Sequence, residues 1–301
     1  MMKEKFLEHF PQAKVKFDEA LSSYSYTRTG GPADILVFPQ TIEEVQAIVS
    51  YASTEELPFM VLGNSSNLIV RDGGIEGIVM ILTDLTEAQV QDQALTVEAG
   101  ARLIDVSRLA ADYSLGGLEF ACGIPGSLGG AVFMNAGAYG GEMADIVSQV
   151  DYVDRRGNLC ELTAEELDFA YRHSCFQENG GIVVRVHMQL HSADQTMIES
   201  RMAELTQLRE SKQPLDLPSC GSVFKRPEGH YTGQLIQEAG LQGYTVGGAQ
   251  VSLKHAGFIV NIGQASASDY LAVIAHVQAV VKERYGVDLE TEVRIIGRDN
   301  Q

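Results

Sequence analysis

Positive charge is scarce in this 301-residue chain, which carries 22 Lys and Arg against 40 Asp and Glu, a formal net charge of −18. Nucleic acids and anionic membranes are bound mainly by fields of Lys and Arg. The composition therefore argues against both as partners, whereas an anionic small molecule can still bind where the few basic residues gather.

Cysteine is also rare, and its four occurrences, Cys122, Cys160, Cys175 and Cys220, form no CxxC pair. In a chain of this size we therefore expect free thiols in a reducing cytoplasm, and no metal site. Long hydrophobic runs are missing as well, since no stretch approaches the ~18–20 apolar residues of a membrane span. Residues 1–17 are charged throughout and lack the apolar core of a signal peptide, so we expect a cytoplasmic protein without membrane insertion.

The remaining composition is ordinary for a soluble globular protein, with 45% hydrophobic and 21% charged residues. Its length allows one large or two medium domains. The expected strands lie at residues 33–38, 58–62, 68–70, 78–82, 95–98, 146–153, 159–162, 182–190, 258–260 and 289–297. The expected helices lie at residues 41–52, 103–113, 196–210, 232–239 and 268–285, with a short one from Thr163. The pattern becomes helical near residue 192, which is the predicted domain boundary.

Glycine is concentrated in one stretch, residues 117–141, where it makes up eight of 25 residues. The stretch has a single charged residue, Glu119, and no Lys or Arg. Glycine permits positive φ and close approach of the backbone to a ligand. An anion held here has to be held by backbone N–H groups. A tightly packed buried loop would explain the same composition, so a dinucleotide cradle needs a second element.

Residues 63–67, GNSSN, provide that element between two expected strands. Asn and Ser tolerate tight turns and leave N–H and O–H donors available. Such a loop suits a pyrophosphate, although no helix follows it as in the Rossmann fingerprint. A simple turn is the alternative, and the glycine-rich stretch about 55 residues later favours the binding interpretation.

Six segments in register resemble the UDP-N-acetylenolpyruvoylglucosamine reductase (MurB) family of peptidoglycan synthesis, from about residue 15 to residue 298. They are TRTGGPAD (27–34), VLGNSSNLIVRDGG (61–74), GIPGSLGGAVFMNAGAYGGE (123–142), YRHS (171–174), SCGSVFKRP (219–227) and LETEVRIIG (289–297). The chain has no room between Ile182 and Ser222 for the tyrosine-loop insertion of some members. It therefore resembles the shorter type, and it departs from many relatives at Leu253, to which we assign no role.

The resemblance implies an α+β fold with two domains. Residues 1–192 would form a FAD-binding domain of the vanillyl-alcohol-oxidase (PCMH) type, in two lobes at about 1–85 and 86–192. Residues 193–301 would form a smaller α+β substrate-binding domain.

The resemblance also implies an FAD-dependent oxidoreductase of cell-wall synthesis. NADPH would reduce non-covalently bound FAD, which would pass hydride to the enolpyruvyl ether of UDP-N-acetylglucosamine-enolpyruvate and give UDP-N-acetylmuramate. The expected partners are NADPH and the UDP-sugar, with no nucleic acid, and the expected state is a monomer.

Three catalytic residues follow from the family motifs. Arg172 would grip the substrate carboxylate, because its planar fork binds carboxylates bidentately and stays protonated. Glu292 would act on the enolate formed by hydride addition, and Ser222 would donate the proton to its carbon. Without the motifs, the favoured interpretations of these residues are a structural arginine, a solvent-facing edge glutamate and a Gly-Ser turn.

The remaining site residues are carried over in the same way. The predicted cofactor residues are Gly63, Asn64, Ser65, Ser66, Asn67, Leu68, Arg71, Gly123, Ile124, Pro125, Gly126, Ser127, Gly129, Gly130, Ala131, Asn135, Ala136, Gly137, Tyr139, Gly140 and Ile182. The predicted substrate residues are Tyr171, Lys225 and Gln250. Lys225 belongs to a group of basic residues that is either a diphosphate contact or a solvated surface: Lys212, Lys225, Arg226, Lys254 and His255.

Two other functions are weighed against this one. The first is a flavoprotein oxidase of the same fold with another substrate. The second is a non-catalytic FAD module that passes electrons to a partner protein. Ser222 and Glu292 on a dedicated C-terminal domain argue against the second, because an electron-transfer module needs no proton donor.

Overall fold

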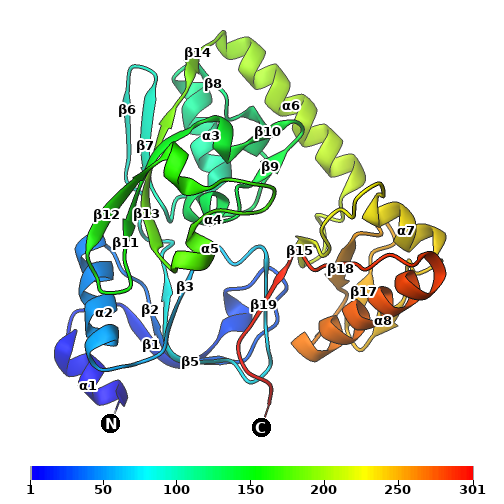
Figure 1. Cartoon of the computed structure of the whole chain (residues 1–301), viewed down its shortest axis with the longest axis horizontal. Coiled ribbons are helices and arrows are strands. Elements are labelled where there is room, and N and C mark those ends of the chain that lie inside the picture. The colour runs from blue at the N-terminus through cyan, green and yellow to red at the C-terminus, as the bar shows by residue number, and fades with distance from the viewer. Residues whose placement is uncertain (1, 301) are drawn as a thin grey trace. The chain divides into compact units, whose positions relative to one another are not determined.

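The computed structural model describes residues 2–300, and its contacts divide the chain into two compact units (Figure 1). Unit 1 comprises residues 2–17, 35–64 and 77–209. Unit 2 comprises residues 18–34, 65–76 and 210–300. Two N-terminal segments thus belong to the same unit as the C-terminal third of the chain. This division by contacts differs from the functional division predicted at residue 192, which stays a prediction.

Unit 1 is built on two sheets. The four-stranded sheet has the order β1-β2-β5-β3, from β1 (Val15–Ala20), β2 (Pro32–Val37), β5 (Ile75–Ile81) and β3 (Phe59–Leu62). The five-stranded sheet has the order β12-β11-β13-β7-β6, from β12 (Leu159–Thr163), β11 (Val147–Val153), β13 (Ile182–Gln189), β7 (Ala94–Glu98) and β6 (Ala88–Gln91). The β3–β5 pair is parallel, and the five-stranded sheet is antiparallel throughout.

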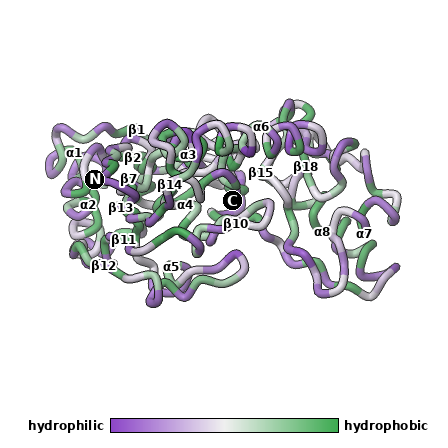
Figure 2. The backbone as a smooth tube through the Cα atoms, turned by 90° about the horizontal axis from the view of Figure 1, so that it is seen from above, coloured by the Kyte–Doolittle hydropathy of each residue, from purple (hydrophilic) through white to green (hydrophobic). Residues whose placement is uncertain are grey.

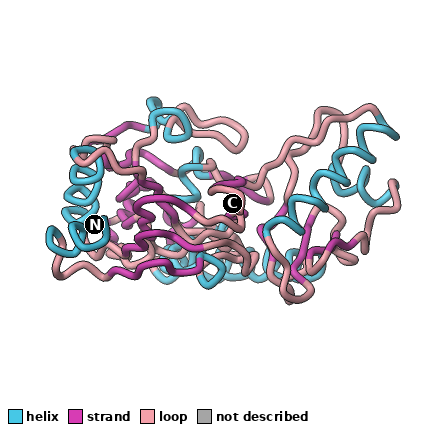
Figure 3. Tube along the Cα trace, turned by 90° about the horizontal axis from the view of Figure 1, so that it is seen from below, coloured by secondary structure: helices cyan, strands magenta, loops and turns pink. Residues whose placement is uncertain are grey.

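Helices and short hairpins surround these sheets, as Figure 3 shows for the strands gathered at the centre of unit 1. The helices are α1 (Met2–His9), α2 (Ile42–Thr54), α3 (Leu103–Asp112), α4 (Leu128–Phe133), α5 (Phe176–Asn179) and α6 (Gln195–Lys212), whose last three residues belong to unit 2. The two-stranded pieces are β8 (Leu115–Gly116) with β14 (His191–Ser192), and β9 (Gly137–Ala138) with β10 (Gly141–Glu142). Helix α2 begins as its sequence predicts, because Thr41 Oγ1 accepts a hydrogen bond from Glu44 N at 3.2 Å.

Strand β13 contributes to two hydrophobic cores. Ile182 and Val184 pack in the core that contains α2 and β5, whereas Val186 packs in the core that contains α3, α4 and β7. The β11–β13 register shifts between Asp151 and Tyr152, and such a bulge turns the side chains that follow it to the other face. A regular strand would place these three alternate side chains on a single face, and the bulge explains why they lie in two cores.

Unit 2 contains a four-stranded antiparallel sheet of order β15-β18-β17-β16 and two helices. These elements are β15 (Ser219–Ser222), β18 (Phe258–Asn261), β17 (Ala249–Val251), β16 (Thr245–Val246), α7 (Thr232–Glu238) and α8 (Ala267–Tyr285). A separate parallel pair joins β4 (Leu68–Val70) to β19 (Arg294–Ile296). Ile69 of β4 is fully buried in the same core as Val277 of α8, so this early segment is an integral part of unit 2.

Most predicted elements are confirmed to within two or three residues, and two differences matter for the site. The glycine-rich stretch contains a helix, α4, which the sequence analysis did not predict. The expected strand over 289–297 is reduced to Arg294–Ile296, because the amides of Glu292 and Val293 both donate to Val223 O. Glu292 therefore precedes the strand instead of lying within it.

Hydrophilic and hydrophobic residues alternate along the backbone of the described chain (Figure 2). Within residues 2–300, none of the helices has the combination of length and apolar character that a membrane crossing requires.

Three residues cap the amino end of α8: Ser266, Asp269 and Asp72. Ser266 and Asp269 form a capping box, while the Asp72 carboxylate accepts from the amides of Ala267 (2.8 Å) and Ser268 (2.9 Å) and from the Ser268 hydroxyl (2.5 Å). Burial by itself would raise the pKa of Asp72, but these hydrogen bonds bring it below its ordinary value. The ionised carboxylate thus supports the amides that an isolated helix leaves without partners.

We predict that Asp72→Ala lowers the free energy of unfolding at pH 7 by about 1–2 kcal/mol, as for loss of a helix cap. Because the folded pKa is depressed, this contribution is present at neutral pH and is lost as the pH falls below about 4. Chemical denaturation of both proteins at pH 7 and pH 3 tests it. The control is Asp288→Ala, which removes an exposed carboxylate paired with Lys282 of the same helix; an equal effect of both variants would contradict the capping role.

Candidate active site

The glycine-rich stretch is a series of backbone turns around a short capped helix. A turn at residues 122–126 leads to Ser127, whose Oγ accepts from Gly130 N at 3.3 Å and caps α4. The β9–β10 hairpin follows, and its turn residues Tyr139 and Gly140 both have positive φ. The conformation of the stretch is therefore defined by backbone turns and by the side-chain cap of α4.

The two segments expected to form one site are in contact within unit 1. Asn64 Nδ2 donates to Pro125 O at 3.0 Å. A Cβ atom at Gly63 would lie 2.1 Å from Ser127 Oγ, so glycine at this position leaves room for the Ser127 hydroxyl. The sequence suggested this pairing from composition, and the structure brings the segments together.

Backbone strain is concentrated at predicted site residues. Between residues 2 and 300, eleven non-glycine residues have positive φ, and four of them are Ser65, Asn135, Tyr139 and Arg172. Such conformations cost free energy and are typical of functional sites. Asn135 is held there by two partly buried hydrogen bonds, from its Nδ2 to Ala170 O (3.1 Å) and from Ala144 N to its Oδ1 (3.0 Å).

Arg172 lies beside the glycine-rich hairpin in unit 1. Its Nη2 donates to Gly137 O at 3.4 Å, and its guanidinium lies 5.2 Å from the ring centroid of the exposed Tyr171. Gln177 Nε2 donates both to Arg172 O (2.9 Å) and to Phe133 O (3.0 Å), which ties the arginine backbone to the end of α4. Two predicted site residues, Tyr171 and Arg172, thus adjoin the predicted cofactor segment.

Ser222 and Glu292 are brought onto neighbouring backbone segments of unit 2. Ser222 ends β15, is exposed, and pairs with Phe258. The next residue, Val223, accepts from Glu292 N at 2.7 Å, and Glu292 is half-buried. The two residues predicted to share the proton chemistry are therefore adjacent across one backbone hydrogen bond, although 70 positions separate them in the sequence.

The end of the GNSSN loop is hydrogen-bonded to the segment that contains Glu292. Asn67 Nδ2 donates to Glu292 O at 3.2 Å, and Asn67 O accepts from Arg294 N at 3.1 Å. Leu68 then pairs with Arg294 in the β4–β19 ladder. A predicted cofactor segment and a predicted catalytic residue thus share one hydrogen-bond network inside unit 2.

Three other predicted residues have partners that bear on their roles. Lys225 Nζ is 3.1 Å from Glu290 Oε2, and Gln250 Nε2 donates to Thr245 Oγ1 at 3.0 Å. Ile182 is buried in the core at the start of β13. The binding roles of all three stay predictions.

A flavin dinucleotide fits the donor chemistry of the glycine-rich stretch. Within residues 2–300, the amides of Gly123 and Gly126 have no protein acceptor, so both are available to phosphate oxygens. Gly140 has a φ of +92°, and no atom lies within 4 Å of the position its Cβ would take. The backbone therefore offers donors and room for a dinucleotide.

Known protein families match both parts of this chain. A family model described as UDP-N-acetylenolpyruvoylglucosamine reductase, C-terminal domain, matches residues 213–296, and a model described as FAD binding domain matches residues 33–163. The reductase of Limosilactobacillus reuteri subsp. reuteri is 57% identical over 98% of this chain and 99% of its own length. The chain belongs to the UDP-N-acetylenolpyruvoylglucosamine reductase family.

Other members agree in sequence and in structure. The reductase of Listeria innocua serovar 6a is 54% identical over 96% of this chain and 97% of its own. The crystal structure of the enzyme (MurB) from Thermus caldophilus superposes with a TM-score of 0.80 at 38% identity, covering 94% of this chain and 98% of that one. The predicted family, the α+β fold with FAD-binding and C-terminal domains, and the FAD cofactor are confirmed. The predicted boundary at residue 192 falls between the two matched ranges.

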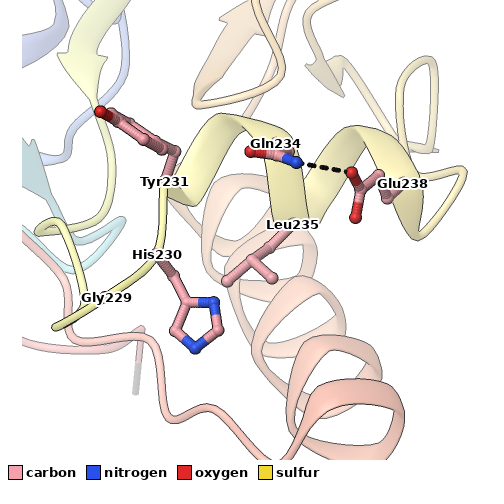
Figure 4. A pocket seen from close by; sticks show the side chains of 6 residues that line it. All are labelled: Gly229, His230, Tyr231, Gln234, Leu235 and Glu238. Carbon is pink, nitrogen blue, oxygen red and sulfur yellow. Dashed lines mark hydrogen bonds between the residues drawn. The ribbon is translucent and has the colours of Figure 1, made fainter.

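One surface hollow in unit 2 is not part of this site. It is lined by Gly229, His230, Tyr231, Gln234, Leu235 and Glu238, and Gln234 Nε2 donates to Glu238 Oε1 at 2.7 Å along α7 (Figure 4). Its volume of about 190 Å³ is below the ~300–1,000 Å³ of small-molecule pockets, and it contains no predicted site residue. Among residues 2–300, no group of three or more His, Cys, Asp or Glu side chains is arranged to hold a metal ion.

One residue that the sequence did not indicate lies beside the predicted cofactor segment. Arg209 of α6 lies against the glycine-rich turn, where a Cβ at Gly123 would be 2.7 Å from its Cδ. The sequence offered no signal for this contact, because an arginine on a helix that is mostly polar is expected to be solvated.

We predict that Gly63→Ala lowers the free energy of unfolding by about 1–3 kcal/mol, the usual cost of overpacking, because the new methyl group meets Ser127 Oγ. The double variant Gly63→Ala/Ser127→Ala removes that oxygen and leaves a distance of 3.2 Å to Ser127 Cβ. Chemical denaturation of the two single variants and the double variant measures the coupling. The double variant is expected to be more stable than the sum of the single effects, and simple additivity would contradict the contact.

Proposed function

We propose that this chain is an FAD-dependent UDP-N-acetylenolpyruvoylglucosamine reductase of peptidoglycan synthesis. It uses NADPH to reduce the enolpyruvyl group of UDP-N-acetylglucosamine-enolpyruvate to the lactyl group of UDP-N-acetylmuramate. The observation that carries this proposal is the 57% identity to a curated reductase over nearly the whole of both chains. FAD, when bound, supplies the hydride transfer between NADPH and the sugar.

In unit 1, the chain positions the cofactor and holds the substrate carboxylate. The backbone of residues 123–130 and 136–140, with Gly63 and Asn64, holds the dinucleotide. Arg172 grips the carboxylate through its guanidinium fork. The left-handed backbone of Arg172 and its hydrogen bond to Gly137 support this role, because they fix the start and the end of a long side chain.

In unit 2, Ser222 and Glu292 act on the reacting carbons. Hydride addition to the methylene carbon leaves negative charge on the carbon next to the carboxylate. Glu292 acts on this enolate, and the Ser222 hydroxyl donates the proton that completes the lactyl group. Their adjacency across the Val223–Glu292 hydrogen bond supports the shared role. A serine hydroxyl is a very weak acid, and the strongly basic enolate carbon makes the transfer feasible.

The proposal also covers the ligands, the oligomeric state and the cellular location of the enzyme. The ligands are NADPH and the UDP-sugar, with Tyr171, Lys225 and Gln250 as sugar-nucleotide contacts. The enzyme acts as a monomer in the cytoplasm and binds no nucleic acid. The four free cysteines support the cytoplasmic location. The net charge of −18 supports the statement that the enzyme binds no nucleic acid.

An anaerobic titration tests the whole reaction. We expect the purified protein to show a flavin spectrum that is bleached by NADPH and regained on addition of the stoichiometric UDP-enolpyruvyl sugar, without a partner protein. Bleaching without recovery would keep the flavin site and leave an oxidase or an electron-transfer module. Protein that takes up no FAD would contradict the proposal.

We predict that Ser222→Ala lowers turnover by roughly 10²–10⁴-fold, the usual contribution of a positioned acid. Bleaching of the flavin by NADPH should proceed at its normal rate, because that half of the reaction needs no proton from Ser222. Stopped-flow measurement of the two half-reactions separates these effects. The control is Ser219→Ala in the same strand, and a turnover within a few-fold of wild type for Ser222→Ala would exclude Ser222 as the donor.

A further inference from the structure

Arg209 is a half-buried cation for which the described chain provides no counter-charge. Its Nε is buried and has no hydrogen-bond partner, one of two such side-chain atoms among residues 2–300. No carboxylate of the described chain forms an ion pair with it, and the titratable groups that interact with its charge are the Tyr139 phenol and the Cys122 thiol. Burial accordingly lowers the pKa of Arg209.

The surroundings of Arg209 place it on the glycine-rich turn. Successive turns of α6 contact this turn: Cys122 Sγ lies 3.6 Å from Met202 O and 3.7 Å from Thr206 Oγ1, and Arg209 lies against Gly123. These positions, i, i+4 and i+7, share one face of the helix. The helix is thus laid along the turn so that its last basic side chain on that face ends at Gly123.

A buried charge without a partner is costly, and the protein offsets this cost only in part. The carboxyl end of α6 contributes about half a negative charge near Arg209. That does not replace an ion pair, since isolated buried ions cost several kcal/mol. The amides of Gly123 and Gly126 add further positive potential at the same turn. The Arg209 guanidinium and the two glycine amides are three hydrogen-bond donors at one turn, and no carboxylate of the described chain pairs with the guanidinium. This arrangement indicates a site for an anionic ligand.

We propose that Arg209 is the cationic ligand of the diphosphate of FAD, which it binds together with the amides of Gly123 and Gly126. The inference rests on the proposed function only for the identity of the dinucleotide. FAD is favoured over the UDP-sugar because the same turn contacts Gly63 and Asn64, the other cofactor segment. The glycine-rich stretch has no basic side chain, and α6 supplies the missing one.

The test is flavin binding by the full-length chain freed of its flavin. We expect Arg209→Met to raise the Kd for FAD by about 10–100-fold, as for loss of charge-assisted hydrogen bonds, and to leave the Kd for riboflavin within about twofold. Arg209→Lys should fall between, because lysine keeps the charge and loses the fork. The control is Arg201→Met on the same helix, where the exposed Arg201 pairs with Glu204 at 2.5 Å.

Thermal melting separates binding from folding. The methionine keeps the apolar stem and removes the unpaired charge, so flavin-free Arg209→Met should melt no lower than flavin-free wild type. The rise in melting temperature on adding FAD should shrink. A lower melting temperature of the flavin-free variant with the full FAD-induced rise retained would show a structural role and overturn the proposal.

Two further outcomes would also overturn it. An equal loss of FAD and riboflavin binding would mean that Arg209 does not act on the diphosphate. An unchanged Kd for FAD with a raised KM for the UDP-sugar would assign the arginine to the substrate diphosphate. Because binding is measured without turnover, failure of the reductase assay would leave this result intact, and the two proposals can fail independently.

Discussion

The hydrogen bonds that join residues 67–74 to residues 292–298 are the constraint on which unit 2 and its half of the site depend. They include Arg294 N to Asn67 O, Arg71 N to Ile296 O, and Gly73 N to Arg298 O. A Cβ at Gly73 would lie 2.2 Å from Asp299 O, so the two backbones are as close as glycine allows. Because Glu292 lies at the start of this pairing, its position is determined by residues more than 200 positions earlier in the chain.

The predicted cofactor site in unit 1 also depends on close contacts between distant segments. Its proposed ligand-binding groups are backbone amides. Gly63 lies against Ser127, Asn64 bonds to Pro125, and Asn135 holds the hairpin that Arg172 contacts. A site built from backbone amides cannot adjust by changing a rotamer, so its geometry has to be fixed by close approach and by strained φ angles. The glycine and asparagine residues that this chain has at these positions are thus a consequence of how the ligand is held.

The sequence predicted the motifs of this site better than their arrangement. Hydrophobic periodicity and capping signals located most helices and strands, because these depend on residues close together in the sequence. The same local reasoning did not predict α4 within a run of glycines, whose helix propensity is low, since its stability comes from the core around Leu128 and Val132. It also placed Glu292 inside a regular strand, because nothing local shows that Val223 O accepts two amides there.

The sequence by itself determined the family, the FAD chemistry and the residue types of the site, because motifs of this specificity carry them directly. Only the tertiary structure decided that residues 65–76 belong to the C-terminal unit, that Ser222 and Glu292 are neighbours, and that Arg209 lies on the glycine-rich turn. These facts depend on strand pairing and helix packing between distant segments. Such contacts leave no periodic signal in either segment alone, so a single sequence does not contain them in readable form.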